Sequence, residues 1–62
     1  MVSAMTIYTP GQICPVSGQY EIVWVSSKRR TGVERTVVRG EPFPPTPFSG
    51  QGYILVDRTK TR

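Results

Sequence analysis

A turn sequence that occurs twice constrains this chain more than any other feature. Pro-x-Ser-Gly-Gln occupies residues 15–19 and returns at residues 47–51. A tyrosine follows each copy, directly as Tyr20 and, after one inserted glycine, as Tyr53. Proline fixes φ on entry to such a turn, serine can bond the backbone, and glycine accepts the left-handed conformation. The repeat therefore predicts two tight turns that each begin a strand with an aromatic side chain.

Three apolar runs read as strands. Residues 20–25 and 53–56 follow the two turns, and residues 33–38 form a β-branched run between them. A polar, basic loop at residues 26–32 separates the first run from the middle one, which predicts an antiparallel hairpin. Residues 5–8 suit a further strand or an arm. In the register of the repeat, one apolar face is expected to carry Tyr20, Ile22, Trp24, Tyr53 and Leu55.

Proline and glycine argue against helix throughout the chain. Six prolines and six glycines occur among 62 residues, and no segment has a helical apolar period. Residues 42–47, Pro-Phe-Pro-Pro-Thr-Pro, favour polyproline II geometry and form what we call the proline strap. We expect an all-β fold, a small antiparallel sheet of three to four strands with this strap, either like a metal-free zinc ribbon or like a small barrel.

The length allows one domain, residues 1–62, with residues 57–62 as a frayed tail. A chain this short buries only about 60% of its unfolded surface. Its single cysteine, Cys14, cannot form an internal disulfide. Since small domains need some such support, we expect a homo-oligomer or a complex with a partner protein.

Residues 14–18, Cys-Pro-Val-Ser-Gly, resemble the knuckle of a zinc ribbon with its second cysteine replaced by serine. A structural zinc site needs four ligands, usually Cys or His, and this chain has one cysteine and no histidine. An ordinary turn with a partly buried Cys14 is therefore the expectation, and no metal or other cofactor is expected.

The chain also resembles the YjzC-like group of very short, uncharacterised bacterial proteins. The resemblance spans residues 9 to about 60 and rests on turn motifs: Pro10-Gly11, the first Pro-x-Ser-Gly-x-Tyr, Gly40-Glu41 leading into Pro44-Pro45-Thr46-Pro47, and Gly52-Tyr53-x-Leu55-Val56. It implies a small stand-alone bacterial domain, and it carries over no catalytic residue.

Catalysis is poorly supported by the sequence. No histidine is present to act as a base near neutral pH, and the four carboxylates are scattered singly. Glu21 and Glu34 can meet across the predicted hairpin, where they would repel unless Arg35 or Lys28 lay between them. We therefore expect a non-enzymatic protein that acts as a protein–protein interaction or structural module.

Two sets of residues are candidates for binding. Aromatic side chains would contact a partner protein if they are exposed, and the candidates are Trp24, Phe43 and Phe48; alternatively, the strap uses both phenylalanines to cover the sheet. Basic side chains give the alternative of nucleic-acid binding at the hairpin tip, through Lys28, Arg29, Arg30, Arg35 and Arg39. A solvated tip that keeps the sheet edge from pairing is the simpler interpretation of these charges.

Charge and composition leave the partner class open. The formal charge of +4 and the pI near 9.9 suit nucleic acid, anionic surfaces or acidic proteins. No apolar run is long enough to span a membrane, and the first residues lack the pattern of a secretory signal. With one unpaired cysteine, we expect a cytoplasmic protein without membrane partners.

Overall fold

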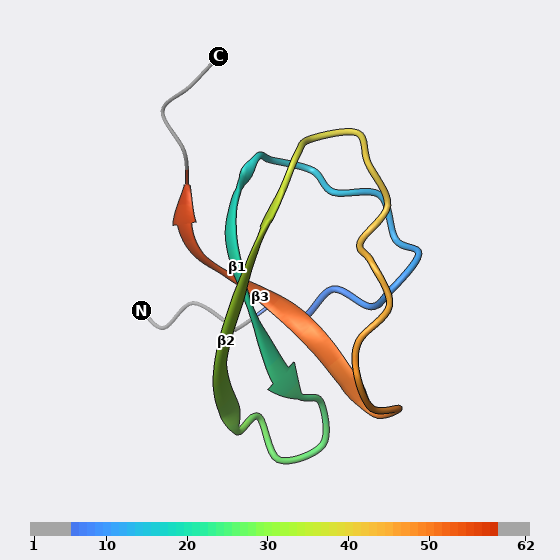
Figure 1. The fold of residues 1–62 in the computed structure, drawn as a ribbon, viewed down its shortest axis with the longest axis vertical. Coiled ribbons are helices and arrows are strands. Elements are labelled where there is room, and N and C mark those ends of the chain that lie inside the picture. The colour runs from blue at the N-terminus through green and yellow to red at the C-terminus, as the bar shows by residue number, and fades with distance from the viewer. Residues whose placement is uncertain (1–5, 59–62) are drawn as a thin grey trace.

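The fold is an open, three-stranded antiparallel sheet, seen in a computed structural model that describes residues 6–58. The strands are β1 (Gly18–Trp24), β2 (Arg30–Val37) and β3 (Gln51–Arg58), in the order β2-β1-β3. Residues 6–58 contain no helix, so the all-β prediction is confirmed. The sheet stays open and does not close into a barrel. The end of β1 and the starts of β2 and β3 meet at one end of the sheet (Figure 1).

All three strands differ from the predicted runs by one to three residues at each boundary, and two of these differences are informative. β3 continues through Asp57 and Arg58, so these residues pair with β1 and are not part of a frayed tail; the rest of that tail, residues 59–62, lies outside the described residues. β2 starts at Arg30, three residues early, because the strand contains a bulge. Glu21 pairs with Glu34 but Val23 pairs with Arg30, and Gly32 takes a φ of 84° in between. A glycine within a strand pattern is the usual sign of such a bulge.

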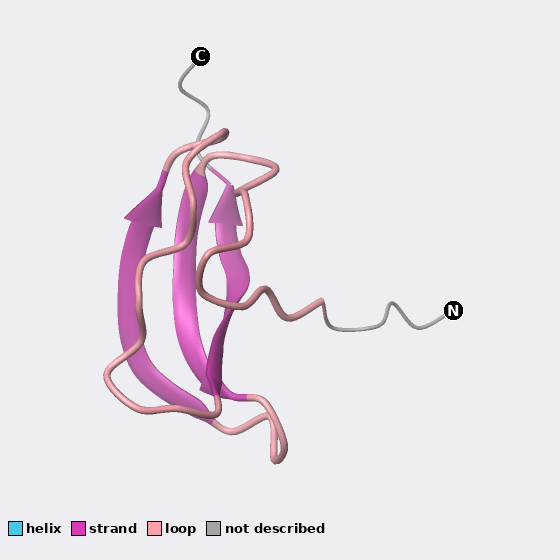
Figure 2. Ribbon diagram, turned by 90° about the vertical axis from the view of Figure 1, so that its right-hand side faces the viewer, coloured by secondary structure: helices cyan, strands magenta, loops and turns pink. Residues whose placement is uncertain are grey.

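A second layer, which we call the covering layer, crosses one face of the sheet (Figure 2). It consists of residues 11–14 and residues 40–43, which run antiparallel and meet at an isolated bridge between Ile13 and Pro42. Backbone bonds join them from Gly11 N to Phe43 O, Phe43 N to Gln12 O, Cys14 N to Glu41 O and Gly40 N to Cys14 O, all 2.8–2.9 Å. The start of the proline strap thus covers the sheet, as predicted, but it does so paired with an N-terminal segment.

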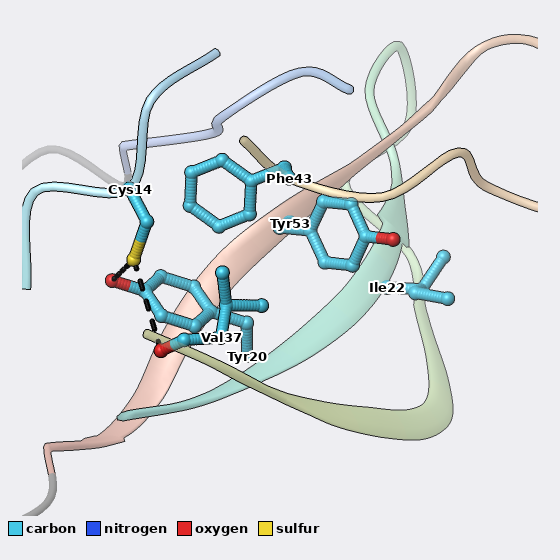
Figure 3. Packing of buried hydrophobic residues seen from close by; sticks show 6 residues of the cluster. All are labelled: Cys14, Tyr20, Ile22, Val37, Phe43 and Tyr53. Carbon is cyan, nitrogen blue, oxygen red and sulfur yellow. Dashed lines mark hydrogen bonds between the residues drawn. The ribbon is translucent and has the colours of Figure 1, made fainter. Parts of the chain in front are cut away.

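Aromatic rings fill the space between the sheet and the covering layer (Figure 3). Phe43 lies at the centre, with its ring centroid 4.9 Å from that of Tyr20, 5.1 Å from Tyr8 and 5.2 Å from Tyr53. The buried cluster is completed by Cys14, Ile22 and Val37. Of the predicted apolar face, Tyr20, Ile22 and Tyr53 are fully buried, whereas Trp24 is half-buried and Leu55 is 36% exposed. Leu55 lies on β3, an outer strand that has only one neighbouring strand along most of its length.

The opposite face of the sheet is also buried around β1. Glu21, Val23 and Ile54 are each at most 6% exposed there. The N-terminal segment pairs with the outer edge of β3 through the bridge between Tyr8 and Tyr53, and this places Ile7 beside Gly52. A central strand buried on both faces explains why the apolar pattern of residues 20–25 alternates only partly.

Candidate functional site at one end of the sheet

The most prominent exposed aromatic group is a stacked pair at the end of the sheet where β1 finishes. The rings of Trp24 and Phe48 lie 5.9 Å apart between centroids, with 27° between their planes. Phe48 is 62% exposed and Trp24 is half-buried. Aromatic side chains carry large apolar area with little conformational freedom, which makes them frequent anchors in protein interfaces.

Hydrogen bonds hold the loop that carries Phe48. The Thr46 hydroxyl donates to the Phe48 carbonyl at 2.9 Å, and the Phe48 N–H donates to Gln51 Oε1 at 3.2 Å. The Val25 N–H donates to the Gly50 carbonyl at 2.9 Å, which ties the loop to the end of β1. Gly50 has a φ of 87°, the left-handed conformation expected of the glycine in this turn. The exposed ring is therefore presented by an ordered loop.

The basic hairpin turn starts from the same residue, Trp24. The Lys28 N–H donates to the Trp24 carbonyl at 2.6 Å, and the Trp24 N–H donates to the Arg29 carbonyl at 2.9 Å. Lys28 has a φ of 62°, the one non-glycine residue with a positive φ in the described part of the chain. Lys28 and Arg29 are both exposed. We call Trp24, Lys28, Arg29 and Phe48 together the sheet end.

Arg30 forms an ion pair with the buried carboxylate of Glu21. Its guanidinium contacts Glu21 Oε1 at 2.6 Å through Nη2 and at 2.8 Å through Nε, while the Gly32 N–H donates to Glu21 Oε2 at 2.8 Å. These hydrogen bonds, that of Arg30 first, hold the pKa of Glu21 below its ordinary value even though burial acts to raise it. Glu21 does face Glu34 across the hairpin, as predicted, but Arg30 compensates the charge of Glu21, and not Arg35 or Lys28.

The remaining predicted basic residues lie elsewhere. Arg35 pairs with Tyr20 in the middle of the sheet. Burial raises the pKa of the Tyr53 hydroxyl, and the positive charge of Arg35 partly offsets this rise. Arg39 lies at the opposite end, where its N–H donates to Ser17 Oγ at 2.8 Å. The five basic residues therefore do not form one continuous surface.

The predicted partner-binding residues are divided in a similar way. The structure brings Trp24 and Phe48 together, but Phe43 is 2% exposed at the centre of the core and is not accessible to a partner. The sequence grouped Phe43 with Phe48 because both flank prolines in the strap, and nothing in the pattern shows which ring faces inward. Sequence reasoning also missed the contact of Glu21 with Arg30 and Gly32, for which the available signal was Gly32, directly before the predicted strand at residues 33–38.

Cys14 lies inside the core and not on a metal knuckle. Its thiol has three acceptors in reach, the Val16 carbonyl at 3.0 Å, the Tyr20 hydroxyl at 3.5 Å and the Val37 carbonyl at 3.8 Å. Burial raises the pKa of Tyr20, and the contact with Cys14 raises it further. Within residues 6–58 there is no group of three or more His, Cys, Asp or Glu side chains placed to hold a metal ion.

Comparison with known proteins gives one uncharacterised relative. The chain is 41% identical over 54 residues to the uncharacterised protein Rv1954A of Mycobacterium tuberculosis. The aligned part is 87% of this chain but 48% of Rv1954A, so the chain spans about half the length of that relative. No family model matches the chain, and no solved structure matches it. The described residues also contain no helix long and apolar enough to cross a membrane.

Proposed function

We propose that this protein is a non-enzymatic interaction module, which binds a partner protein or a second copy of its own chain at the sheet end. The observation that carries the proposal is the exposure of Phe48, which is 62% exposed although hydrogen bonds and stacking on Trp24 hold it in place. An ordered, exposed ring loses little conformational freedom when a partner covers it. It also supplies the kind of aromatic anchor on which binding energy concentrates in protein interfaces.

The small size of the domain supports association as well. The core is one aromatic cluster between a three-stranded sheet and a thin covering layer. Domains of about 60 residues bury a small share of their surface and are marginal without a disulfide, a metal or a partner. Binding to the folded state would add stability by mass action.

Sedimentation of the purified protein over about a hundredfold range of concentration tests self-association. We expect Phe48→Ser to abolish any association that the wild type shows. Ile13→Ser is the matched control, because Ile13 is 61% exposed and lies in the covering layer, away from the sheet end. Association that survives Phe48→Ser contradicts the proposal, and a wild type that stays monomeric eliminates the second copy and leaves a different protein as the partner.

Nucleic-acid binding is a second candidate, favoured by the position of Lys28 and Arg29 beside the exposed aromatic pair. Bases can stack on such a ring while cations contact phosphates. Fluorescence anisotropy with labelled oligothymidylate tests it: binding must weaken steeply as salt rises and must depend on both Phe48 and Lys28. Binding that ignores either residue contradicts this candidate.

We also propose that the chain belongs to the YjzC-like group and acts in the cytoplasm. Two of the motifs that carry the resemblance contain glycines that the fold needs, since Gly11 and Gly40 have φ of 90° and 93° in turns. Labelling of Cys14 by a thiol reagent after denaturation, in protein taken directly from cells, tests the reducing compartment. A cysteine found already oxidised contradicts the cytoplasmic location.

A further inference from the structure

We propose that the partner of the sheet end is an acidic segment of a different protein, in which Asp or Glu side chains flank an apolar residue. This inference rests on the proposed function and names the chemistry of the partner. The apolar residue would pack on the exposed face of Phe48, and the carboxylates would contact Lys28 and Arg29. Four observations lead to it: the placement of charges, the backbone of Lys28, the net charge and the dispersal of the other arginines.

Charges around the sheet end are of one sign. Among the described residues, neither Lys28 nor Arg29 forms an ion pair. Glu21 and Glu34 face each other within the strands: Glu21 is buried and bonded to Arg30 and Gly32, and Glu34 is exposed on β2. Asp57 lies at the far end of β3, where it pairs with Gln19, and Glu41 lies in the covering layer, where its backbone carbonyl accepts from the Cys14 N–H. The turn bonded to Trp24, on which Phe48 stacks, thus carries two exposed positive charges without an ion pair among the described residues, and an acidic partner complements them.

The strained backbone at Lys28 favours an external contact for its charged side chain. Lys28 has a φ of 62°, a conformation that glycine or asparagine adopts with less strain. The bonds from the Lys28 N–H to Trp24 and from Trp24 to Arg29 require only the backbone at this position. A strained residue whose side chain has no internal partner is a candidate for an external contact. The ammonium group of Lys28 is exposed and free to make one.

A second copy of the chain fits this surface poorly. A twofold interface places the same patch against itself, so Lys28 and Arg29 of one copy would approach those of the other. The chain carries a formal charge of +4, which adds repulsion between copies. An acidic partner meets neither obstacle.

Nucleic acid is also a weaker fit than an acidic protein segment. A strand of nucleic acid binds through a series of phosphate contacts, and its affinity grows with their number. Here Arg30 is paired with Glu21, Arg35 lies in mid-sheet and Arg39 lies at the opposite end. A protein interface needs only an aromatic anchor with a charged rim, which is what the sheet end provides.

Selection of peptides from a randomised display library on the immobilised full chain tests the inference without assuming a partner. We expect enriched peptides to carry an excess of Asp and Glu around an apolar residue. Selected peptides are then labelled and their binding is measured by fluorescence anisotropy, against wild type, Phe48→Ser, the double variant Lys28→Asn with Arg29→Gln, and the control Ile13→Ser. The double variant should bind about tenfold more weakly, with a flatter salt dependence, and Ile13→Ser should bind like wild type.

Thermal unfolding separates lost charge from lost structure. Asparagine tolerates the left-handed conformation and Arg29 is exposed, so the double variant Lys28→Asn with Arg29→Gln should unfold at the same temperature as wild type or higher. Weaker peptide binding by a variant that is at least as stable assigns the loss to the missing charge.

Each other outcome contradicts the inference in a recognisable way. Neutral or basic peptides that still require Phe48 overturn the acidic partner and leave the proposed function intact. Peptide binding that is unaffected by Phe48→Ser overturns both the acidic partner and the proposed function of the sheet end. Tighter binding of oligothymidylate than of the best peptide favours nucleic acid instead, and a selection with no enrichment over an uncoated surface removes the protein partner altogether.

Discussion

β1 and β3 begin from the same turn sequence and yet have different roles in the molecule. They are antiparallel neighbours, with Tyr20 opposite Leu55 and Ile22 opposite Tyr53. Both tyrosines are fully buried against Phe43, and each hydroxyl donates to a carbonyl upstream in the chain, that of Val16 or Pro44. What the two copies share is the placement of a buried tyrosine at the beginning of a strand.

What they do not share is set by position in the sheet. β1 is central and buried on both faces, whereas β3 is an outer strand. Gly18 is already part of β1, while Gly50 precedes β3 with a left-handed φ of 87°. The second residue of the motif is the half-buried Val16 in one copy and the exposed Phe48 in the other. The same turn sequence therefore serves the core in the first copy and presents an exposed aromatic ring in the second.

The inserted Gly52 distinguishes the second copy of the turn from the first. Of the changes tested below, its substitution should have the largest effect on stability. A Cβ at this position would lie 2.7 Å from both Ile7 Cγ2 and the Tyr8 carbonyl oxygen. The backbone oxygen cannot move aside without breaking the bridge between Tyr8 and Tyr53. We expect Gly52→Ala to lower the free energy of unfolding by about 2–3 kcal/mol, measured by chemical denaturation.

Gly50→Ala is the matched variant in the same turn. A Cβ there would meet no atom closer than 4.0 Å, so the substitution introduces only the strain of a left-handed alanine, about 1 kcal/mol. A loss from Gly52→Ala no larger than that from Gly50→Ala would show that the N-terminal segment does not need to cross β3 so closely.

The charged Glu21 follows the first tyrosine, whereas the apolar Ile54 follows the second. This difference predicts that stability depends on pH. Glu21 and Ile54 are neighbours in the sheet, and both are buried. The folded protein holds the pKa of Glu21 below its ordinary value of 4.5. The stabilisation from the ionised form is therefore complete above that pH and is lost as pH falls through the folded-state pKa.

Glu21→Gln should remove this pH dependence. At neutral pH the variant loses its bond to Arg30 but keeps an acceptor for the Gly32 N–H, and Arg30, whose side chain is 56% exposed, regains water. We expect the free energy of unfolding to fall by about 1–2 kcal/mol near neutral pH, and this difference from wild type should shrink toward zero on acidification. Unfolding measured between about pH 7 and about pH 3 checks this. Glu34→Gln is the control, since Glu34 is exposed on the neighbouring strand. If Glu21→Gln remained less stable than wild type in acid, the stabilisation could not come from the ionised form of Glu21.

Local patterns predicted the elements well because each element follows from residues close together in sequence. The turn at Pro10-Gly11 forms as expected, with a bond of 3.1 Å from Gln12 N to the Thr9 carbonyl. Gly40, in the turn motif Gly40-Glu41, has a positive φ in the turn that follows β2. The hairpin and the burial of both tyrosines also follow from local pattern.

The candidate site was only half predictable, because it depends on contacts between distant segments. Trp24 and Phe48 are far apart in sequence, and their stacking requires the antiparallel pairing of β1 with β3. The burial of Phe43 requires the pairing of the strap with residues 11–14, which no periodicity reveals. Arg30 was grouped with Lys28 and Arg29, and only the bulge at Gly32 turns its side chain to Glu21.

Removal of the two tyrosine hydroxyls should have the smallest effects on stability, and it compares the two copies of the turn directly. Tyr53→Phe leaves the Pro44 carbonyl without the donor it has at 2.8 Å, whereas Tyr20→Phe leaves the Val16 carbonyl with the Cys14 thiol at 3.0 Å. We expect Tyr53→Phe to lower the free energy of unfolding by about 1–1.5 kcal/mol and Tyr20→Phe by about 0.5–1 kcal/mol. Both values come from chemical denaturation at neutral pH. Adding Cys14→Ala to Tyr20→Phe should lower stability by more than the sum of the single changes, because the Val16 carbonyl then loses both donors. Strict additivity would show that thiol and hydroxyl do not share this acceptor, and that the first tyrosine is held in the same way as the second.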